Sequence, residues 1–387
     1  MTDSSDRPSK PGKKKIRVDL RRNRRKSNRD RTEWTRLYES GADKAHETAS
    51  SENVRAKGDL SRKRTVVVPD QPAGQGGVVV AMRGQLCEVD DGSRIWACTV
   101  RRLLRTRLIT ERHPIVVGDR VQFEAVEVGG EEARAVSVEQ DLPEGVIEDV
   151  APRQTTLLRQ YERRVHVIAA NVDTIVIVVA ADQPTLRPHL IDRYLVAVHK
   201  GDMRPVICIN KADLDVDGFA GEVRDRYAAL GYRAILACVP RGEGVDALRE
   251  ELRDRTSSVI GPSGVGKSSL INAIDPRFNL AVGTLTDLAR GKHTTTTARL
   301  LRWAFGGYIV DTPGIRQFEL AEVRSDELEA YFKEFVDRVS GCRFQNCTHT
   351  HEVGCAIKTA VESGEITPER YESYCKMYEE CKEKQRF

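Results

Sequence analysis

Apolar positions follow two different periods along the second half of the chain. The mostly apolar segment 172–181 predicts a strand buried on both faces, whereas 189–201 has the apolar spacing of a helix ended by Gly201. The pattern then predicts strands at 204–210, 232–239, 258–260 and twice within 298–314, and helices at 222–231, 244–255 and 267–274. This alternation favours an α/β fold with a doubly wound, mostly parallel sheet covered on both faces.

Shorter strand-like segments precede this region, with no helical period between them. They lie at 77–84, 85–91, 90–100, 116–128 and 132–139. Asp91 and Gly92 mark a hairpin turn, and 145–153 is interpreted as the connection that leads out of the group. Five short strands in one stretch predict a small OB-like β-barrel.

The two ends of the chain differ from both regions. Residues 1–72 are polar, with no sustained apolar period beyond one possible helical turn around Trp34. After Asp326 the chain is charged, with helical spacing at 326–339 and 367–384. We expect a mostly disordered basic tail at 1–72, an OB-like domain at 73–150, an α/β domain at 151–325 and a small helical domain at 326–387.

Charge is distributed unevenly, although the net charge is only +4 over 387 residues. Eleven Lys and Arg against two Asp lie between Lys13 and Arg31, and such a run repels itself and lacks apolar residues for a core. It is either a solvated tail or an arm that neutralises nucleic-acid phosphates. The predicted barrel has a basic side that is typical of RNA-binding barrels, formed by Arg83, Arg94, Arg101, Arg102, Arg105 and Arg107.

The sequence contains no signal for export or membrane insertion. Its longest apolar run, 174–181, is far shorter than the roughly 20 residues that cross a bilayer, and the N-terminus has no apolar secretory segment. The nine Cys are an odd number and several stand alone, which argues against a disulfide framework. We therefore expect a cytoplasmic, monomeric protein that does not engage membranes.

A phosphate-binding loop is predicted at 261–269, where the sequence reads GPSGVGKSS. Its glycines allow successive backbone N–H groups to turn around a phosphate, and the following helix directs its positive end at the same point. Lys267 supplies a charge to the β- and γ-phosphate oxygens, and the Ser268 hydroxyl is a ligand for Mg²⁺. The expected nucleotide contacts are Gly261, Pro262, Ser263, Gly264, Val265, Gly266, Lys267, Ser268 and Ser269.

The sequence NKAD at 210–213 ends an apolar strand, where ligand-binding loops of α/β proteins lie. The Asp213 carboxylate can accept both N–H groups of the guanine edge, whereas adenine presents the wrong pattern. Asn210 can donate to a ring nitrogen, and the Lys211 stem can lie along the base, with Ala212 between them. The alternative is that Asp213 caps a helix in solvent.

Further nucleotide contacts are predicted in the segment that follows the phosphate loop. Asp311 ends a strand and can hold Mg²⁺ through a water molecule, while the Gly314 N–H can contact the γ-phosphate. The hydroxyl-rich loop 291–297 is suitable for a switch, in which Thr295 or Thr296 completes the Mg²⁺ coordination.

Two residues bear on the rate of hydrolysis. His293 either positions the attacking water or is a solvated loop histidine. Ile315 occupies the place where Ras-type GTPases have a water-orienting glutamine, and its aliphatic side chain cannot hydrogen-bond to water. We therefore hypothesise slow intrinsic hydrolysis that a partner accelerates.

Three Cys and two His lie close together near the C-terminus. Cys342, Cys347 and Cys355 with either His349 or His351 supply the four ligands of a tetrahedral structural Zn²⁺ site. Such a site would stabilise a segment that is too short to bury a sufficient core. The alternative is a chance cluster of these residue types.

Taken together, these motifs resemble the ribosome small-subunit-dependent GTPase A family, which are circularly permuted bacterial GTPases. The resemblance covers about 75–360 and rests on VGDRV, NKAD, GPSGVGKSSLIN, GKHTTTT, DTPGIRQF and CRFQNCTHTHEVGCAI. Circular permutation explains why NKAD precedes the phosphate loop, the reverse of the order in Ras-type enzymes. The sequence departs from the family at Lys292, where Arg is usual, and near Cys238, where Ser is usual.

The resemblance implies GTP hydrolysis that the small ribosomal subunit stimulates, late in that subunit's maturation. It also implies a three-domain layout, binding to the subunit and its rRNA, Mg²⁺ with GTP, and one zinc ion held by Cys342, Cys347, His349 and Cys355. Two other functions fit parts of the sequence. A P-loop ATPase or kinase conflicts with NKAD, and a non-catalytic RNA-binding scaffold conflicts with the complete set of Lys267, Ser268 and Asp311.

Overall fold

The computed structural model describes two units, 1–72 and 73–387, each by itself. In the second unit the described residues are 74–102, 104, 115–126, 142–161, 164–280, 298–311 and 323–385. In the first unit it describes two strands, β1 (Lys13–Asp19) and β2 (Lys63–Pro69), which pair antiparallel. The sequence analysis did not predict this pair, and its expected helical turn around Trp34 lies outside the described residues.

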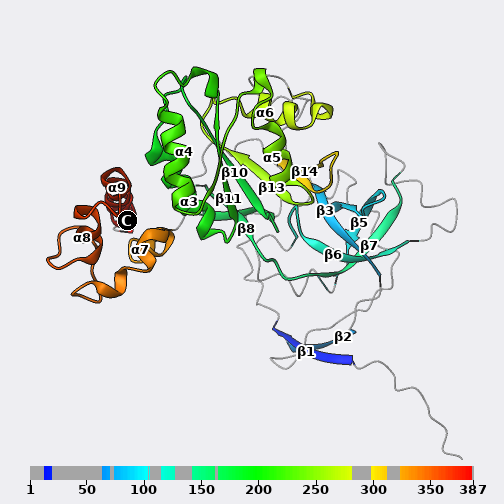
Figure 1. Cartoon of the computed structure of the whole chain (residues 1–387). Coiled ribbons are helices and arrows are strands. Elements are labelled where there is room, and N and C mark those ends of the chain that lie inside the picture. The colour runs from blue at the N-terminus through cyan, green and yellow to red at the C-terminus, as the bar shows by residue number, and fades with distance from the viewer. Residues whose placement is uncertain are drawn as a thin grey trace, which may run out of the picture. The chain divides into compact units, whose positions relative to one another are not determined.

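Five strands form the predicted barrel (Figure 1). They are β3 (Gln75–Arg83), β4 (Leu86–Asp90), β5 (Ile95–Val100), β6 (Arg120–Ala125) and β7 (Glu144–Val150). The sheet follows the order β3-β4-β5-β7-β6, and β6 pairs back to β3, which closes the barrel. Only the β5–β7 pair is parallel among these ladders.

Four of the five predicted barrel segments contain a strand, and the fifth strand of the barrel comes from another segment. Val79, Val89, Phe123 and Ile147 are fully buried and pack together. Ile147 belongs to β7, so the segment interpreted as a connection out of the barrel is one of its strands, whereas the strand predicted at 132–139 lies outside the described residues. The error arose because β7 pairs with β5 across a large sequence separation, which local alternation does not reveal.

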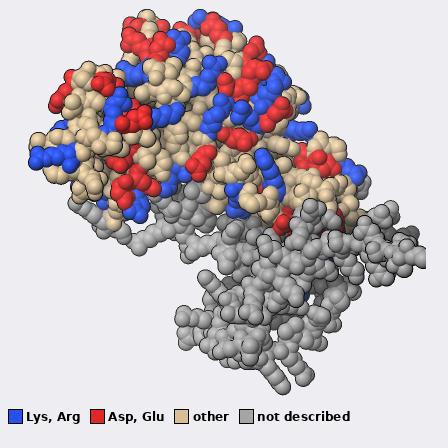
Figure 2. All heavy atoms as spheres, turned by 60° about the horizontal axis from the view of Figure 1, so that its bottom comes forward, with Lys and Arg blue, Asp and Glu red and all other residues tan. Residues whose placement is uncertain are grey.

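The arginines of the barrel are partly neutralised. Arg83 and Arg101 form ion pairs with Glu88 and Glu148. On the face shown in Figure 2, Lys and Arg lie interspersed with Asp and Glu rather than gathered in one basic surface. The ion pairs therefore reduce the positive charge contributed by Arg83 and Arg101, whereas Arg105 and Arg107 of the predicted basic side lie outside the described residues.

The α/β region contains the predicted doubly wound sheet. Its strands are β10 (Thr174–Ala180), β11 (Arg204–Asn210), β12 (Arg233–Leu236), β13 (Thr256–Ile260), β14 (Arg299–Arg302) and β15 (Tyr308–Asp311). They follow the order β12-β11-β10-β13-β15-β14, and only β14 is antiparallel to its neighbours. Strand β14 also pairs with β3, which joins this sheet to the barrel.

Helices cover both faces of this sheet. Alternate residues of β10 point to opposite faces, and every residue of β10 is buried, so neither face is open to solvent there. One face packs on α3 (Pro188–Lys200) and α4 (Phe219–Ala229), and the other on α5 (Val245–Leu252) and α6 (Lys267–Ile274). Short 3₁₀ turns follow three of the strands or helices: η5 (Ala212–Leu214), η6 (Val239–Arg241) and η7 (Pro276–Phe278).

A two-stranded hairpin between the barrel and the sheet was not predicted. Strands β8 (Thr156–Tyr161) and β9 (Arg164–Ala170) pair antiparallel. The Asn171 amide that follows β9 donates to Gly118 O at 2.9 Å, so the hairpin is fixed to the barrel's β6 side.

The C-terminal region is helical, as predicted, but its first helix is broken. The expected helix at 326–339 is divided into η10 (Leu328–Tyr331), α7 (Lys333–Val336) and η11 (Val339–Gly341). Then follow α8 (Ala356–Glu362) and the long α9 (Pro368–Gln385). Among the described residues, no helix is both long enough and apolar enough to span a membrane.

Candidate functional site

Three predicted loops meet at the carboxyl edge of the parallel sheet. The phosphate loop follows β13, NKAD begins at the last residue of β11, and Asp311 ends β15. In the sheet, β10 and β13 are neighbours. The strands that follow β10 in the chain, β11 and β12, lie on one side of this pair, and the strands that follow β13 lie on the other side. A crevice at such a reversal of strand order is the usual ligand site of an open α/β sheet.

The phosphate loop has the backbone conformation that its glycines allow. Gly261 has φ 144°, and a Cβ there would lie 2.0 Å from Val178 O, so no other residue fits. Gly266 has φ 90° and is the N-cap residue of α6. The loop therefore closes tightly and presents the amino end of α6 to a phosphate.

Two side chains at the start of α6 belong to the predicted phosphate site. Lys267 folds back across the loop, where its Nζ donates to Gly261 O at 2.9 Å and Pro262 O at 2.6 Å. Ser268 lies in the first turn of α6 and is 9% exposed. The Lys267 ammonium is thus held by backbone oxygens of the loop.

The base loop is joined directly to the phosphate loop. Asn210 is buried, and its Nδ2 donates to Val265 O at 2.9 Å. Among the described residues its Oδ1 has no hydrogen-bond partner. Lys211 is in the left-handed conformation at φ 58°, and its Nζ donates to Gln183 O in the loop after β10. Hydrogen bonds therefore connect the base loop both to the phosphate loop and to the loop after β10.

Asp213 is exposed, and a thiol that the sequence analysis regarded only as a departure holds its carboxylate. The Cys238 Sγ donates to Asp213 Oδ1 at 3.2 Å. This hydrogen bond is the largest cause of a lowered Asp213 pKa, so the carboxylate is ionised and accepts hydrogen bonds at neutral pH. The alternative that Asp213 caps a helix is not supported, because Asp213 lies within η5 and the start of η5 has no side-chain cap.

Asp311 lies at the end of β15, beside the strand that carries the phosphate loop. Burial raises the pKa of its carboxyl group, and the Arg299 guanidinium opposes that rise. A bound cation would favour the ionised form in the same way. The predicted contacts of His293, Thr295, Thr296, Gly314 and Ile315 lie outside the described residues.

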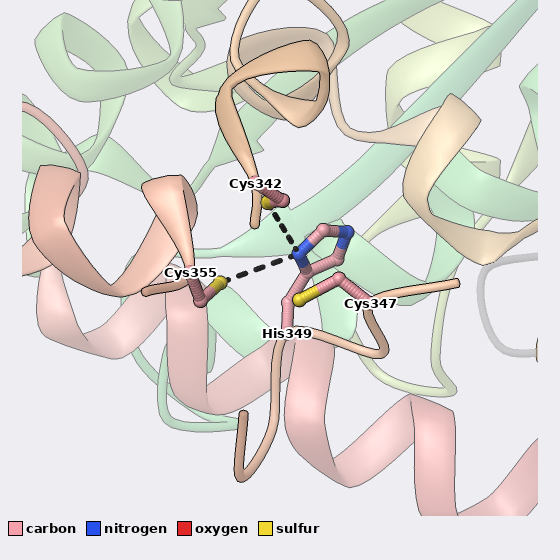
Figure 3. Close-up of side chains that lie close together, drawn as sticks. All are labelled: Cys342, Cys347, His349 and Cys355. Carbon is pink, nitrogen blue, oxygen red and sulfur yellow. Dashed lines mark hydrogen bonds between the residues drawn. The ribbon is translucent and has the colours of Figure 1, made fainter. Parts of the chain in front are cut away.

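A second constellation lies in the C-terminal region (Figure 3). The ligand atoms of Cys342, Cys347, His349 and Cys355 all lie within 4.8 Å of one another. His349 Nδ1 is 3.6 Å from the Cys342 Sγ and 3.4 Å from the Cys355 Sγ. His351 is exposed and hydrogen-bonds to Thr350, so the alternative that spacing left open is decided for His349.

Comparisons with known proteins agree with the GTPase region. A profile of the RsgA GTPase family matches residues 150–321. The small ribosomal subunit biogenesis GTPase RsgA of Thermotoga maritima is 39% identical over 311 residues, which make up 79% of this chain and 96% of that protein. The protein of the same name from Sodalis glossinidius is 40% identical and covers 80% of this chain and 87% of its own length. The chain belongs to the RsgA GTPase family.

Two solved structures share this fold. YjeQ from Thermotoga maritima has a TM-score of 0.64 and 36% identity, and covers 79% of this chain and 98% of its own. YloQ, described as a circularly permuted GTPase, has a TM-score of 0.62 and 28% identity, and covers 80% of this chain and 95% of its own. The predicted fold, a circularly permuted GTPase with a five-stranded barrel and a C-terminal Cys₃His cluster, is therefore confirmed.

The RsgA family order explains the positions of the two recognition loops. In the sheet, β13 with the phosphate loop lies centrally, and β11 with NKAD lies two strands away. In the chain, β10, β11 and β12 come before β13. Reading the chain from β13 through β15 and then from β10 to β12 restores the order in which the phosphate loop comes first. NKAD is therefore displaced in sequence while it remains beside the phosphate loop in space.

Proposed function

We propose that this RsgA-family GTPase acts on the small ribosomal subunit during its late maturation, in the cytoplasm, and that the subunit stimulates GTP hydrolysis. The observation that carries the nucleotide assignment is the Asn210–Val265 hydrogen bond, which joins the base loop to the phosphate loop at the switch point of the sheet. The names of the relatives, small ribosomal subunit biogenesis GTPase, support the choice of partner.

In this proposal each loop contacts a different part of GTP. The backbone of 261–266 and Lys267 surround the β- and γ-phosphates, and Ser268 is a direct ligand of the nucleotide's Mg²⁺. Asp311 acts on that ion through water, and Asp213 accepts the two N–H groups of guanine. His293, as a water-positioning group, and Gly314, as a γ-phosphate contact, remain predictions.

The Cys₃His cluster fits one structural zinc ion. Three sulfurs and one imidazole nitrogen are the donors that Zn²⁺ prefers, and their number leaves no open position for chemistry. Burial raises the pKa of Cys347 to about 12, and the neighbouring Cys355 and Cys342 thiols contribute to this rise. A divalent cation reverses that effect because it binds the thiolate form. The ion would stabilise the loop between η11 and α8.

The barrel is proposed to contact rRNA. Arg94 is exposed in the β4–β5 turn, and its Cζ atom lies 4.1 Å from the centroid of the Trp96 ring, which is itself buried in the barrel core, so the hairpin offers RNA a cation. Cations that track the phosphate backbone are one of the components with which OB-like barrels bind single-stranded RNA. The ion pairs of Arg83 and Arg101 make this contribution smaller than the count of arginines alone would indicate.

Phosphate release from GTP and from ATP, each with and without purified small subunits, tests the proposal. We expect turnover of GTP alone, slow for the isolated protein and faster with subunits. Turnover of ATP would favour a P-loop ATPase or kinase, and no turnover of either nucleotide would favour a scaffold. Fast GTP turnover that subunits do not change would reject the proposed stimulation.

Asp213→Ala is expected to weaken the discrimination between GTP and ATP. The two guanine N–H groups would then lose their acceptor in the site, and sites built around such hydrogen bonds discriminate by roughly 10⁴-fold or more. Competition of ATP against a fluorescent GTP analogue measures the effect. Asp217→Ala, an exposed carboxylate in the same loop, is the matched control and should leave the preference unchanged.

A further inference from the structure

The His349 imidazole is held on both of its ring nitrogens. Nδ1 points toward the sulfurs of Cys342 and Cys355, and Nε2 lies 2.7 Å from the Oε2 of Glu329. An imidazole that donates Nε2–H to a carboxylate presents the lone pair of Nδ1 on its other side. Glu329 therefore selects the form of His349 in which Nδ1 faces the three thiols.

We propose that Glu329 is a positioning residue for the metal site, outside the ligand set, which orients His349 and strengthens Nδ1 as a donor. Carboxylate partners of metal-bound histidines act in this way in other proteins, and their loss typically weakens metal binding 10–100-fold. The inference rests on the proposed zinc site. Glu329 lies in η10, outside the Cys/His loop, so ligand spacing could not reveal it.

The residues around His349 fix its backbone and pack on its ring, and Glu329 forms the hydrogen bond that orients the ring. Tyr371 Oη donates to His349 O at 2.7 Å and Tyr374 Oη to Thr348 O at 3.0 Å, so α9 fixes the backbone of the ligand loop. Phe335 and Tyr374 lie against the imidazole with ring centroids 5.9 and 6.0 Å away, so these two rings pack on it. Glu329 supplies a polar contact at Nε2.

Glu329 is itself positioned through the GTPase sheet's helix α3. Two residues earlier, Glu327 accepts a hydrogen bond from Lys200 at the end of α3, at 2.7 Å. Between them Leu328 is fully buried in the C-terminal core. The turn η10 thus connects α3 to the imidazole of the metal site. The same turn is the first described element after the segment that follows Asp311.

Zinc affinity tests the role of Glu329 in the full-length holoprotein. Competition with a chromogenic chelator is expected to show 10–100-fold weaker zinc binding for Glu329→Ala than for the wild type. Glu329→Gln keeps an oxygen that accepts the Nε2–H, so it should lose less affinity. Glu365→Ala removes an exposed carboxylate of the same region that pairs with Arg338, and its affinity should equal that of the wild type.

Two further measurements separate the possible failures. The absorption spectrum of Co²⁺-substituted protein should shift in Glu329→Ala and return toward the wild type in Glu329→Gln, because the imidazole donor has changed. GTP turnover without subunits reports that each variant is folded. Equal zinc affinities for wild type and Glu329→Ala would overturn the role of Glu329, whereas absence of zinc from the wild type would overturn the zinc site as well.

Discussion

Arg370→Met is expected to lower the free energy of unfolding by about 3–5 kcal/mol, because it leaves two buried carboxylates without a counter-charge. Arg370 is 4% exposed and lies near the start of α9. Its Nε donates to Glu334 Oε1 in α7 at 2.6 Å, and its Nη1 donates to Asp192 in α3. The guanidinium therefore joins the C-terminal region to a helix of the GTPase sheet.

The large effect follows from the burial of all three groups. Asp192 is 1% exposed and Glu334 is 8% exposed, so neither can be solvated when the arginine is removed. Tyr227 Oη also donates to Asp192 Oδ1, at 2.5 Å, but a neutral hydroxyl cannot replace the charge. Methionine retains much of the volume over the Phe332 ring, which lies 4.4 Å from the guanidinium Cζ. The variant thus changes charge more than packing.

Urea unfolding of the full chain measures this difference. Arg193→Met is the matched control, because Arg193 pairs with Glu380 between the same two helices, yet both side chains are partly exposed. Arg193→Met should lower the free energy of unfolding by no more than about 1 kcal/mol. Adding Asp192→Asn and Glu334→Gln to Arg370→Met should recover part of the stability. Equal losses for the two arginine variants would contradict the argument.

Local sequence patterns predicted the strand and the helix that adjoin the two loops well, for a physical reason. The strand at 204–210 and the helix at 267–274 have the bounds observed for β11 and α6, because apolar runs, glycine positions and helix starts are encoded by neighbouring residues. The phosphate loop has the same property. Gly261 approaches Val178 O so closely that only glycine fits there, and the phosphate-loop motif has glycine at this position.

The contacts missed by the sequence analysis join residues that are distant in the chain. Arg370 is 178 residues from Asp192, and Cys238 is 25 residues from Asp213. Neither residue type in isolation indicates its partner. The prediction of one helix at 326–339 was wrong for a related reason. Phe332 and Phe335 have helical spacing, but both pack against Tyr374 of α9. The backbone is extended at Phe332, which separates η10 from α7. Tertiary packing there overrides local propensity.

Lys267→Ala is expected to abolish measurable GTP turnover and to weaken GTP binding by about 2–5 kcal/mol, the usual cost of removing one partner of a buried, hydrogen-bonded charge pair. The ammonium is already positioned over the loop by Gly261 O and Pro262 O, at 2.9 and 2.6 Å. Phosphate oxygens entering the loop would therefore meet a charge that needs little reorganisation. Lys376→Ala, which removes a surface lysine paired with Glu372, should leave turnover unchanged.

Nucleotide-induced stabilisation separates loss of binding from loss of chemistry in this variant. A ligand that binds only the folded state at 100 times its Kd adds about 2.7 kcal/mol to the free energy of unfolding. The wild type should show such a gain with GDP or a non-hydrolysable GTP analogue, and Lys267→Ala should show little at the same concentration. Without nucleotide the two proteins should unfold at similar urea concentrations, because Lys267 contacts backbone oxygens of its own loop. Wild-type turnover in Lys267→Ala would contradict the assignment of 261–269 as the phosphate loop. It would also remove the argument that NKAD is a base loop because it adjoins the phosphate loop.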